Sequence, residues 1–157
     1  MNLEKTTKDS LTEHTQIIMS NHINGAGRLF GGRLMEWIDM VAGVVGRRHS
    51  GCNIITAAID NLQFKEGAYI NEIVVLIGRI TYVGNSSMEV RVDTYVEDHK
   101  GMRTPINRAY LVLVALDEED KPIRVPRLKL ETEGERAEWE GAIRRANLRK
   151  QRRLEGF

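Results

Sequence analysis

The sequence predicts an α+β fold in which a curled antiparallel sheet wraps around one long central helix, with a second helix at the C-terminus. Three observations support this prediction. Residues 30–48 repeat apolar side chains with helical spacing, four long strand-type segments follow, and the chain ends in another helical stretch. Long strands in one antiparallel sheet curl, and an apolar helix lying in the curl covers the concave face.

The central helix is expected from about Phe30 to Arg48. Its apolar face consists of Leu34, Ile38, Val41 and Val45, at steps of four, three and four, widened by Trp37 and Ala42. Ser50 and Gly51 follow, and such residues end helices.

The strands are expected on both sides of this helix. A short extended piece precedes it, and the apolar period changes to two after it. Residues 73–83 are mostly apolar, which predicts a strand covered on much of both faces, whereas residues 88–97 alternate apolar and polar side chains, as in a half-buried strand. The expected strands are 15–19, 54–64, 73–83, 88–97 and 109–116, and the final helix is 132–152.

Length and composition place the chain among globular proteins. It has 157 residues, 41% hydrophobic and 29% charged, which fits one domain and excludes a disordered chain. We expect the domain at 1–131 and a basic helical extension at 132–157. Cys52 is the single cysteine, which excludes a disulfide framework and a cysteine-clustered metal site. The N-terminus has no apolar core of signal-peptide length, so we expect a cytoplasmic protein without a membrane span.

Basic residues gather near the C-terminus. Residues 141–154 contain no acidic residue, and the rest of the chain holds 17 basic and 22 acidic residues. The favoured interpretation is a solvated helix whose cations suit the negative end of its dipole or pair with an acidic neighbouring subunit. The alternative is a polyanion contact. The six basic residues are Arg144, Arg145, Arg149, Lys150, Arg152 and Arg153.

Asp39 interrupts the central helix beside its apolar face. Its helical neighbours on that side are Gly32, Met35, Gly43 and Gly46, although a mid-helix glycine costs roughly 0.5–1 kcal/mol relative to alanine. Two interpretations stay open. Either Asp39 faces solvent on an amphipathic helix, or the glycines let a backbone or ligand approach closely and the carboxylate stands in a groove.

The segment before the helix is rich in glycine, from Gly25 to Gly32. Backbone amides at a helix start point toward the positive end of the dipole, where they hold a phosphate or a developing oxyanion. A dinucleotide fingerprint fails because Phe30 stands where its third glycine is needed. The chain has no P-loop and no G-x-S-x-G elbow for a serine esterase, and its four histidines lack metal-ligand spacing.

Several motifs together resemble the hotdog-fold acyl-CoA thioesterases, in particular the bacterial short-chain and animal cytosolic acyl-CoA hydrolases. The opening motif is Asn24-x-x-Gly27-x-x-Phe30-Gly31-Gly32-x-Leu34-Met35-x-x-x-Asp39. Further matches, in the family's order, are Ile55-Thr56-Ala57 with Phe64, the segment from Gly84 to Val90, and the closing segment from Leu116 to Pro126.

The resemblance implies a hydrolase that cleaves acyl-coenzyme A and takes part in lipid metabolism. It makes Asp39 the general base or nucleophile, makes Asn24 a group from the partner subunit that orients water or substrate, and places the oxyanion site at Gly31 and Gly32. It implies no metal and no cofactor, coenzyme A being part of the substrate, and a homo-oligomer of hotdog dimers, commonly a homohexamer built as a trimer of dimers. The coenzyme A contacts it implies are Thr56, Gly84, Asn85, Ser86 and Ser87.

Two functions of other classes compete with this one. A hotdog domain can bind acyl-CoA or a nucleotide as a sensor, but such a module needs neither Asn24 nor Asp39. Nucleic-acid binding through the basic tail is the other, and the near-zero net charge and the lack of aromatic residues in 141–154 weigh against it.

Overall fold

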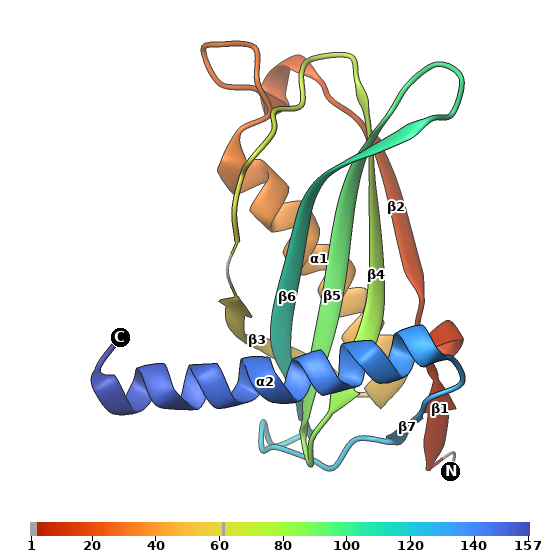
Figure 1. The fold of residues 1–157 in the computed structure, drawn as a ribbon, viewed down its shortest axis with the longest axis vertical. Helices are drawn as coiled ribbons and strands as arrows, with labels where there is room; N and C mark the ends of the chain where they lie inside the picture. The colour runs from red at the N-terminus through yellow and green to blue at the C-terminus, as the bar shows by residue number, and fades with distance from the viewer. Residues whose placement is uncertain (1–2, 61) are drawn as a thin grey trace.

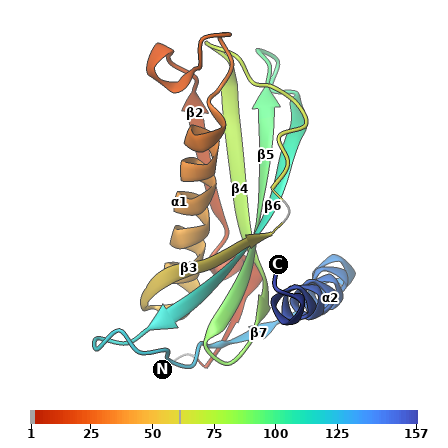
Figure 2. The same ribbon diagram turned by 90° about the vertical axis from the view of Figure 1, so that its left-hand side faces the viewer.

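The computed structural model describes residues 3–60 and 62–157. Strands β2, β4, β5, β6 and β3 form one antiparallel sheet in that order, and β1 pairs in parallel with β7. Figures 1 and 2 show the sheet curled around α1 on one face, with α2 crossing the opposite face near one end. The predicted α+β architecture is confirmed. The elements are β1 (Glu4–Thr6), β2 (Thr12–Ile17), α1 (Gly31–Ser50), β3 (Asn53–Asp60), β4 (Ile73–Val83), β5 (Ser87–Glu97), β6 (Arg103–Leu116), β7 (Arg127–Lys129) and α2 (Glu133–Glu155), with 3-10 turns at Thr7–Asp9 and Ser20–His22.

Helix α1 packs its predicted apolar face into the curl. All six predicted face residues are buried, against the inward side chains of β4, β5 and β6. The helix crosses β4 closely at Gly78, where a Cβ atom would lie 2.7 Å from Val41 Cγ1 and 3.0 Å from Val45 Cγ2. Gly51 ends the helix in the left-handed conformation with φ 71°, which glycine adopts at little cost.

Three strand predictions differ from the structure in their bounds. The short piece before the helix is Thr12–Ile17, and β3 ends at Asp60; of the extra predicted residues, Asn61 lies outside the described part and 62–64 form no strand. Strand β6 starts at Arg103, well before the apolar run at Ala109, because its polar first half pairs with β5.

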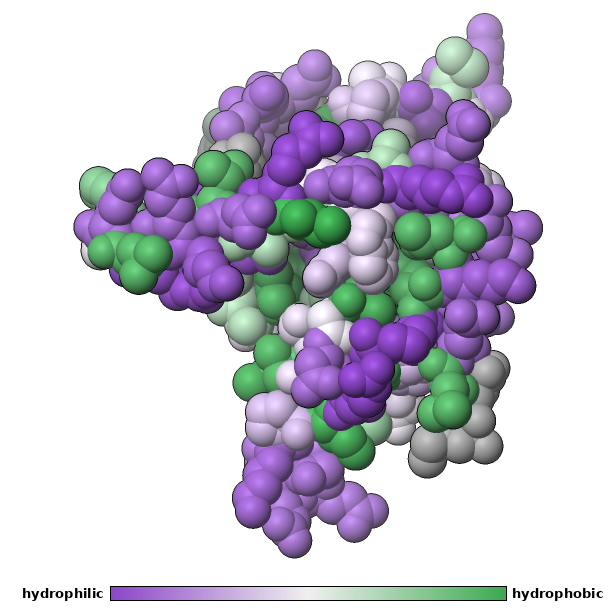
Figure 3. Space-filling model, turned by 60° about the horizontal axis from the view of Figure 1, so that its bottom comes forward, coloured by the Kyte–Doolittle hydropathy of each residue, from purple (hydrophilic) through white to green (hydrophobic). Residues whose placement is uncertain are grey.

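Helix α2 lies across the outer face of the sheet and is anchored by packing and by ion pairs. Trp139 packs on Tyr82 with ring centroids 4.3 Å apart, and Ala142 is buried. At the helix start, Thr132 and Glu135 form a capping box. Its C-terminal end projects past the sheet, and this end carries apolar side chains among polar ones (Figure 3).

Half of the basic tail pairs with carboxylates of the same chain. Arg145 donates from Nε and Nη2 to Glu89 at 2.9 and 2.8 Å, and Glu89 is only 2% exposed. Arg149 and Arg152 both pair with Asp60, which is 7% exposed. The acidic partners of these three arginines therefore lie beneath the helix, in the same chain. The other three tail cations are exposed and have no ion pair within the described residues: Arg144, Lys150 and Arg153.

The described helices include none that is both long and apolar enough to cross a membrane.

Candidate active site

Asp39 stands halfway along the outer face of α1, bonded to the neighbouring strand. The hydroxyl of Thr56, on β3, donates to Asp39 Oδ1 at 2.6 Å. Both side chains are exposed in the single chain. The sequence suggested Thr56 as a coenzyme A contact and did not predict this bond to Asp39.

The glycine stripe beside Asp39 lets the sheet approach the helix. A Cβ atom at Gly46 would lie 2.7 Å from Leu113 Cδ1 and 3.5 Å from Ile54, and one at Gly43 would lie 3.7 Å from Ile54. Side chains of β3 and β6 therefore occupy the space that larger helix residues would need. This close approach brings β3, and Thr56 with it, alongside the carboxylate.

Asp39 lines a groove with a volume of about 560 Å³ between α1 and the two sheet edges, β2 and β3. Met40 and Val44 add apolar walls that are 51% and 38% exposed, and Arg47 lines the groove one helix turn beyond Val44. An apolar groove with a few convergent polar groups suits a ligand with an apolar chain and one reactive polar group. The groove interpretation of Asp39 therefore fits the geometry better than a carboxylate on an open surface.

The start of α1 carries two amides without partners. The carbonyl oxygen of Phe30 accepts from the amides of Arg33 and Leu34 at 2.9 and 3.1 Å, whereas the amides of Gly31 and Gly32 make no hydrogen bond within residues 3–60 and 62–157. The ring of Phe64 lies 3.6 Å from where a Gly31 Cβ would stand. These amides are donors for an anion or an oxyanion beside an apolar ring.

Asn24 shapes the loop in front of α1. Its Oδ1 accepts from the amides of Ala26 and Arg28 at 3.0 and 3.3 Å, whereas Nδ2 has no hydrogen bond within the described part of the chain. This loop is tied to the helix start, because the amide of Phe30 donates to the carbonyl oxygen of His22 at 2.9 Å. Asn24 and the free helix-start amides therefore belong to one end of the molecule.

This end of the chain is too far from Asp39 to act on the same atom. At about 1.5 Å per residue, Gly31 and Asp39 are separated by about 12 Å along the helix axis. A base and an oxyanion donor must both lie within about 3 Å of their reacting atoms. Within one chain, the groove around Asp39 and the loop around Asn24 and Gly31 are therefore separate features.

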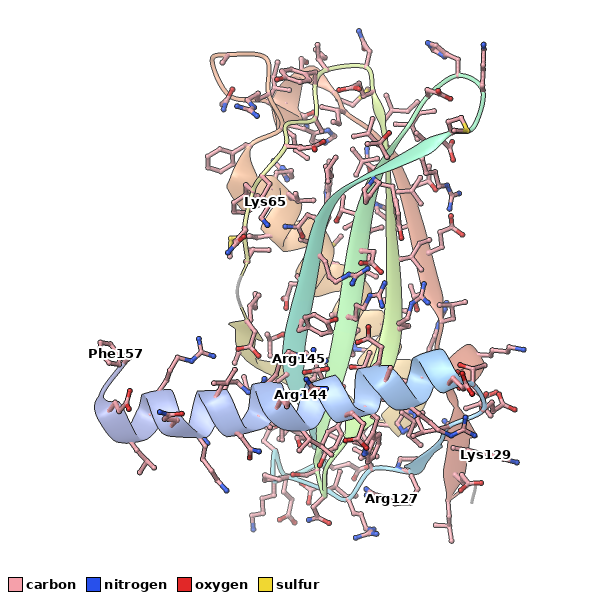
Figure 4. All side chains as sticks on the ribbon, viewed as in Figure 1. Lys65, Arg127, Lys129, Arg144, Arg145 and Phe157 are labelled. Atoms are coloured by element: carbon pink, nitrogen blue, oxygen red, sulfur yellow. The ribbon has the colours of Figure 1, made fainter. Side chains whose placement is uncertain are left out.

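The turn between β4 and β5 lies at the opposite end of the sheet (Figure 1). Gly84 packs closely there, and a Cβ atom at this position would lie 2.5 Å from Ser87 Oγ, so the Ser87 hydroxyl would have to move. Two arginines that the sequence reasoning missed hold the turn: Arg127 Nη2 donates to the Gly84 carbonyl oxygen at 2.7 Å, and Arg124 Nη1 to Asn85 Oδ1 at 3.2 Å. Figure 4 shows Arg127 with Lys129 at this lower end. Within one chain, the predicted coenzyme A contacts are thus divided between this turn and Thr56.

Comparison with known proteins decides the family. Residues 26–102 match the model of the thioesterase superfamily. The uncharacterized acyl-CoA thioester hydrolase YkhA of Bacillus subtilis is 36% identical over 148 residues, which cover 93% of this chain and 86% of the relative. The chain belongs to the hotdog-fold acyl-CoA thioesterases. This thioesterase matches the rat cytosolic acyl coenzyme A thioester hydrolase at 36% identity over 73% of its length, but spans only 31% of that relative.

Two solved structures cover nearly the whole thioesterase. The acyl-CoA hydrolase of Staphylococcus aureus, in complex with butyryl coenzyme A, coenzyme A and coenzyme A disulfide, has a TM-score of 0.91 and 31% identity over 97% of this chain and 93% of that one. A hexameric acyl-CoA thioesterase, also at a TM-score of 0.91, is 33% identical over 95% of this chain and 96% of its own.

The Staphylococcus enzyme has also been solved with single alanine replacements. The residues replaced are one asparagine, one aspartate and one threonine. Their spacings along that chain equal the spacings of Asn24, Asp39 and Thr56 in this one.

Proposed function

We propose that this thioesterase hydrolyses acyl-coenzyme A to a free carboxylic acid and coenzyme A, with Asp39 as the catalytic carboxylate. The hydrogen bond from Thr56 to Asp39, at an apolar groove, is the observation that carries the proposal. The bond holds Asp39 Oδ1 in place, which leaves Oδ2 to accept a proton from water or to attack the substrate. The equal spacing of the three residues replaced in the Staphylococcus enzyme also supports it.

The proposed reaction begins when Asp39 takes a proton from water and the resulting hydroxide adds to the thioester carbonyl carbon. Amides of Gly31 and Gly32 stabilise the oxyanion, the C–S bond breaks, and the thiolate leaves. The proton held by Asp39 then passes to the thiolate or to solvent. In the alternative route, an oxygen of Asp39 adds to the thioester carbonyl carbon, the C–S bond breaks and the thiolate leaves, and water hydrolyses the resulting mixed anhydride to the free acid and the Asp39 carboxylate. A thiolate leaves with little protonation, so neither route requires a metal or a cofactor.

The site needs a second copy of the chain, because Asn24 and the helix-start amides lie too far from Asp39. We propose a dimer in which each chain supplies Asp39 and Thr56 to one site and Asn24, Gly31 and Gly32 to the other. Strand β3, at the edge of the sheet, and the exposed apolar side chains around Asp39 fit such an interface. The hexameric relative supports further assembly into a trimer of dimers.

Coenzyme A is proposed to reach from the Asp39 groove toward the Gly84–Ser87 turn of one of the subunits. The turn amides, Asn85, and the two arginines that hold the turn offer donors for its phosphates. We also propose that the protein acts in the cytosol, by analogy with the rat relative, whose name describes it as cytosolic.

Nucleic-acid binding by the tail is a weaker candidate. Arg145, Arg149 and Arg152 are engaged with buried carboxylates of the same chain. Only half of the tail cations therefore remain for phosphates.

Thiol release from a panel of short to long acyl-CoA esters tests the proposal. We expect hydrolysis by the wild type and a loss of at least about a hundredfold in Asp39→Ala, because a general base is removed. Glu36→Ala is the matched control: it removes an exposed carboxylate of the same helix, whose one ion pair within the described residues is with Arg33, and it should keep full activity. Full activity in Asp39→Ala would show that the site is wrong. Binding of acyl-CoA by the wild type without thiol release would make the protein a sensor.

A further inference from the structure

A second pocket lies on the face of the sheet opposite α1. It has a volume of about 560 Å³ and is bounded by β4, the first turns of α2 and the segment 7–11. Arg79 of β4 lines it. Because its neighbour Gly78 meets α1 and side chains alternate along a strand, Arg79 projects away from α1 and from the Asp39 groove.

Arg79 lacks a counter-ion in the described part of the chain. Its Nε atom is buried without a hydrogen-bond partner, and its guanidinium makes no ion pair there. The residue opposite it on β5 is Arg91, another cation, and like charges at that position repel. A partly buried guanidinium next to a second one is costly unless an anion neutralises it.

The carboxylates around the pocket are already engaged. Arg91 takes Asp93 and Glu138, each at 2.7 Å, and Glu138 also accepts from the hydroxyl of Tyr110 at 3.1 Å. Glu135 accepts from the amides of Glu131 and Thr132 at 2.6 and 2.9 Å. Within the described residues, none of these carboxylates forms an ion pair with Arg79.

The rest of the lining adds one more cation, three threonine side chains and apolar walls. Lys8 has no ion pair among the described residues. Leu11, 45% exposed, lines the pocket together with Leu130 and Ala137. The pocket thus combines an unneutralised guanidinium with aliphatic surface.

We propose that this pocket binds a carboxylate that carries an apolar chain, with Arg79 as its counter-ion. A guanidinium holds a carboxylate through two parallel hydrogen bonds, and the aliphatic walls bury the chain. The binding itself does not depend on the proposed reaction; the link to its product, an acyl acid of this chemical class, does rest on the proposed function.

Titration calorimetry with decanoate tests the proposal on the intact protein saturated with coenzyme A. We expect the wild type to bind decanoate and Arg79→Gln to bind it at least about tenfold more weakly, since the charged pair is lost. Arg153→Gln, which removes an exposed arginine without an ion pair in the described chain, is the matched control and should bind like the wild type. Methyl decanoate, which has the same chain without the charge, should bind as weakly as decanoate binds to Arg79→Gln.

A second variant guards against a folding defect in Arg79→Gln. Leu11→Asp places a carboxylate beside Arg79 at an exposed position and should also weaken decanoate binding. Unchanged binding in both variants, or no binding by the wild type, would overturn the proposal. The proposal would also be overturned if the wild type did not bind decanoate and the oligomer of Arg79→Gln differed in mass from that of the wild type. A second copy of the chain would then be what neutralises Arg79. None of these experiments measures thiol release, so the proposed thioesterase activity is tested independently of decanoate binding.

Discussion

Thr56 holds one oxygen of Asp39 through a hydrogen bond. In the proposed mechanism this bond positions the base, so its loss should lower kcat. Thr56→Val keeps the shape of the side chain and removes the hydroxyl that donates at 2.6 Å. We expect kcat to fall about tenfold, because a hydrogen bond to a charged group is worth about 1.5–3 kcal/mol. Steady-state thiol release measures the change, and Thr56→Ser should restore the rate. Equal kcat in Thr56→Val and the wild type would remove Thr56 from the positioning of the base.

At the residue scale, the sequence pointed to Asp39 but not to its partner. A carboxylate beside the apolar face of a helix, with glycines on the same side, is visible as a pattern. The bond to Thr56 joins residues from a helix and the strand after it, 17 positions apart, and depends on the angle at which they cross. Periodicity carries no information about that angle.

His49 is the residue whose burial couples stability to pH. Its Nε2 lies 2.8 Å from the carbonyl oxygen of Pro126, and its buried Nδ1 has no partner in the described chain. Burial is the largest influence and lowers the pKa of His49; the hydrogen bond with Pro126 comes next and raises it, whereas the nearby cations Lys5 and Arg127 lower it and Asp9 raises it.

A lowered histidine pKa means that the unfolded chain binds the proton more readily than the folded one. The stabilisation by neutral His49 is therefore complete above the ordinary histidine pKa of about 6.5 and is lost as the pH falls below it. Urea unfolding between about pH 8 and pH 5 should show a steeper loss of unfolding free energy in the wild type than in His49→Gln. Parallel pH profiles for the two proteins would contradict this assignment.

At the element scale, the polar face of strand β5 is covered by helix α2, which the pattern of the strand alone did not predict. The alternation in residues 88–97 predicted a half-buried strand, and the sequence predicted a basic helix. Yet Glu89 and Asp93, on the polar side, are 2% and 3% exposed, with Arg145 of α2 on Glu89 and Arg108 on Asp93. A pattern identifies which face of a strand is polar, but the element that covers this face comes from far along the chain.

The short strands β1 and β7 were missed because three residues are too few to show a period.

Arg145 anchors α2, and its removal should destabilise the fold. Arg145→Ala leaves the buried carboxylate of Glu89 without its guanidinium, so we expect a loss of about 2–4 kcal/mol in the free energy of unfolding. The control is Arg144→Ala, since this neighbour is exposed and without an ion pair in the described residues; it should change stability by less than about 0.5 kcal/mol. Chemical denaturation measures both. Equal effects of the two variants would show that the ion pair with Glu89 adds nothing to the docking of α2.

At the scale of the whole molecule, the decisive question is whether one site is built from two chains. Asp39 and Asn24 make no hydrogen bond with each other within the described chain, and the helix axis keeps Gly31 about 12 Å from Asp39. If Asp39 of one chain works with Asn24 of the other, a mixed dimer of Asp39→Ala and Asn24→Ala contains one intact site, because one chain keeps Asp39 and its partner keeps Asn24.

Co-expression of the two inactive variants should therefore restore thiol release to about a quarter of the wild-type rate, since about half of randomly paired dimers are mixed and each of these holds one intact site of two. Each variant alone, purified in the same way, sets the background. Co-expressed with the wild type, the double variant Asp39→Ala/Asn24→Ala should give intact sites only in wild-type dimers, two in each, and none in mixed dimers. If the mixture of single variants stays as inactive as its components, Asp39 and Asn24 act in separate places, and the two-chain site is wrong even if Asp39 remains the base.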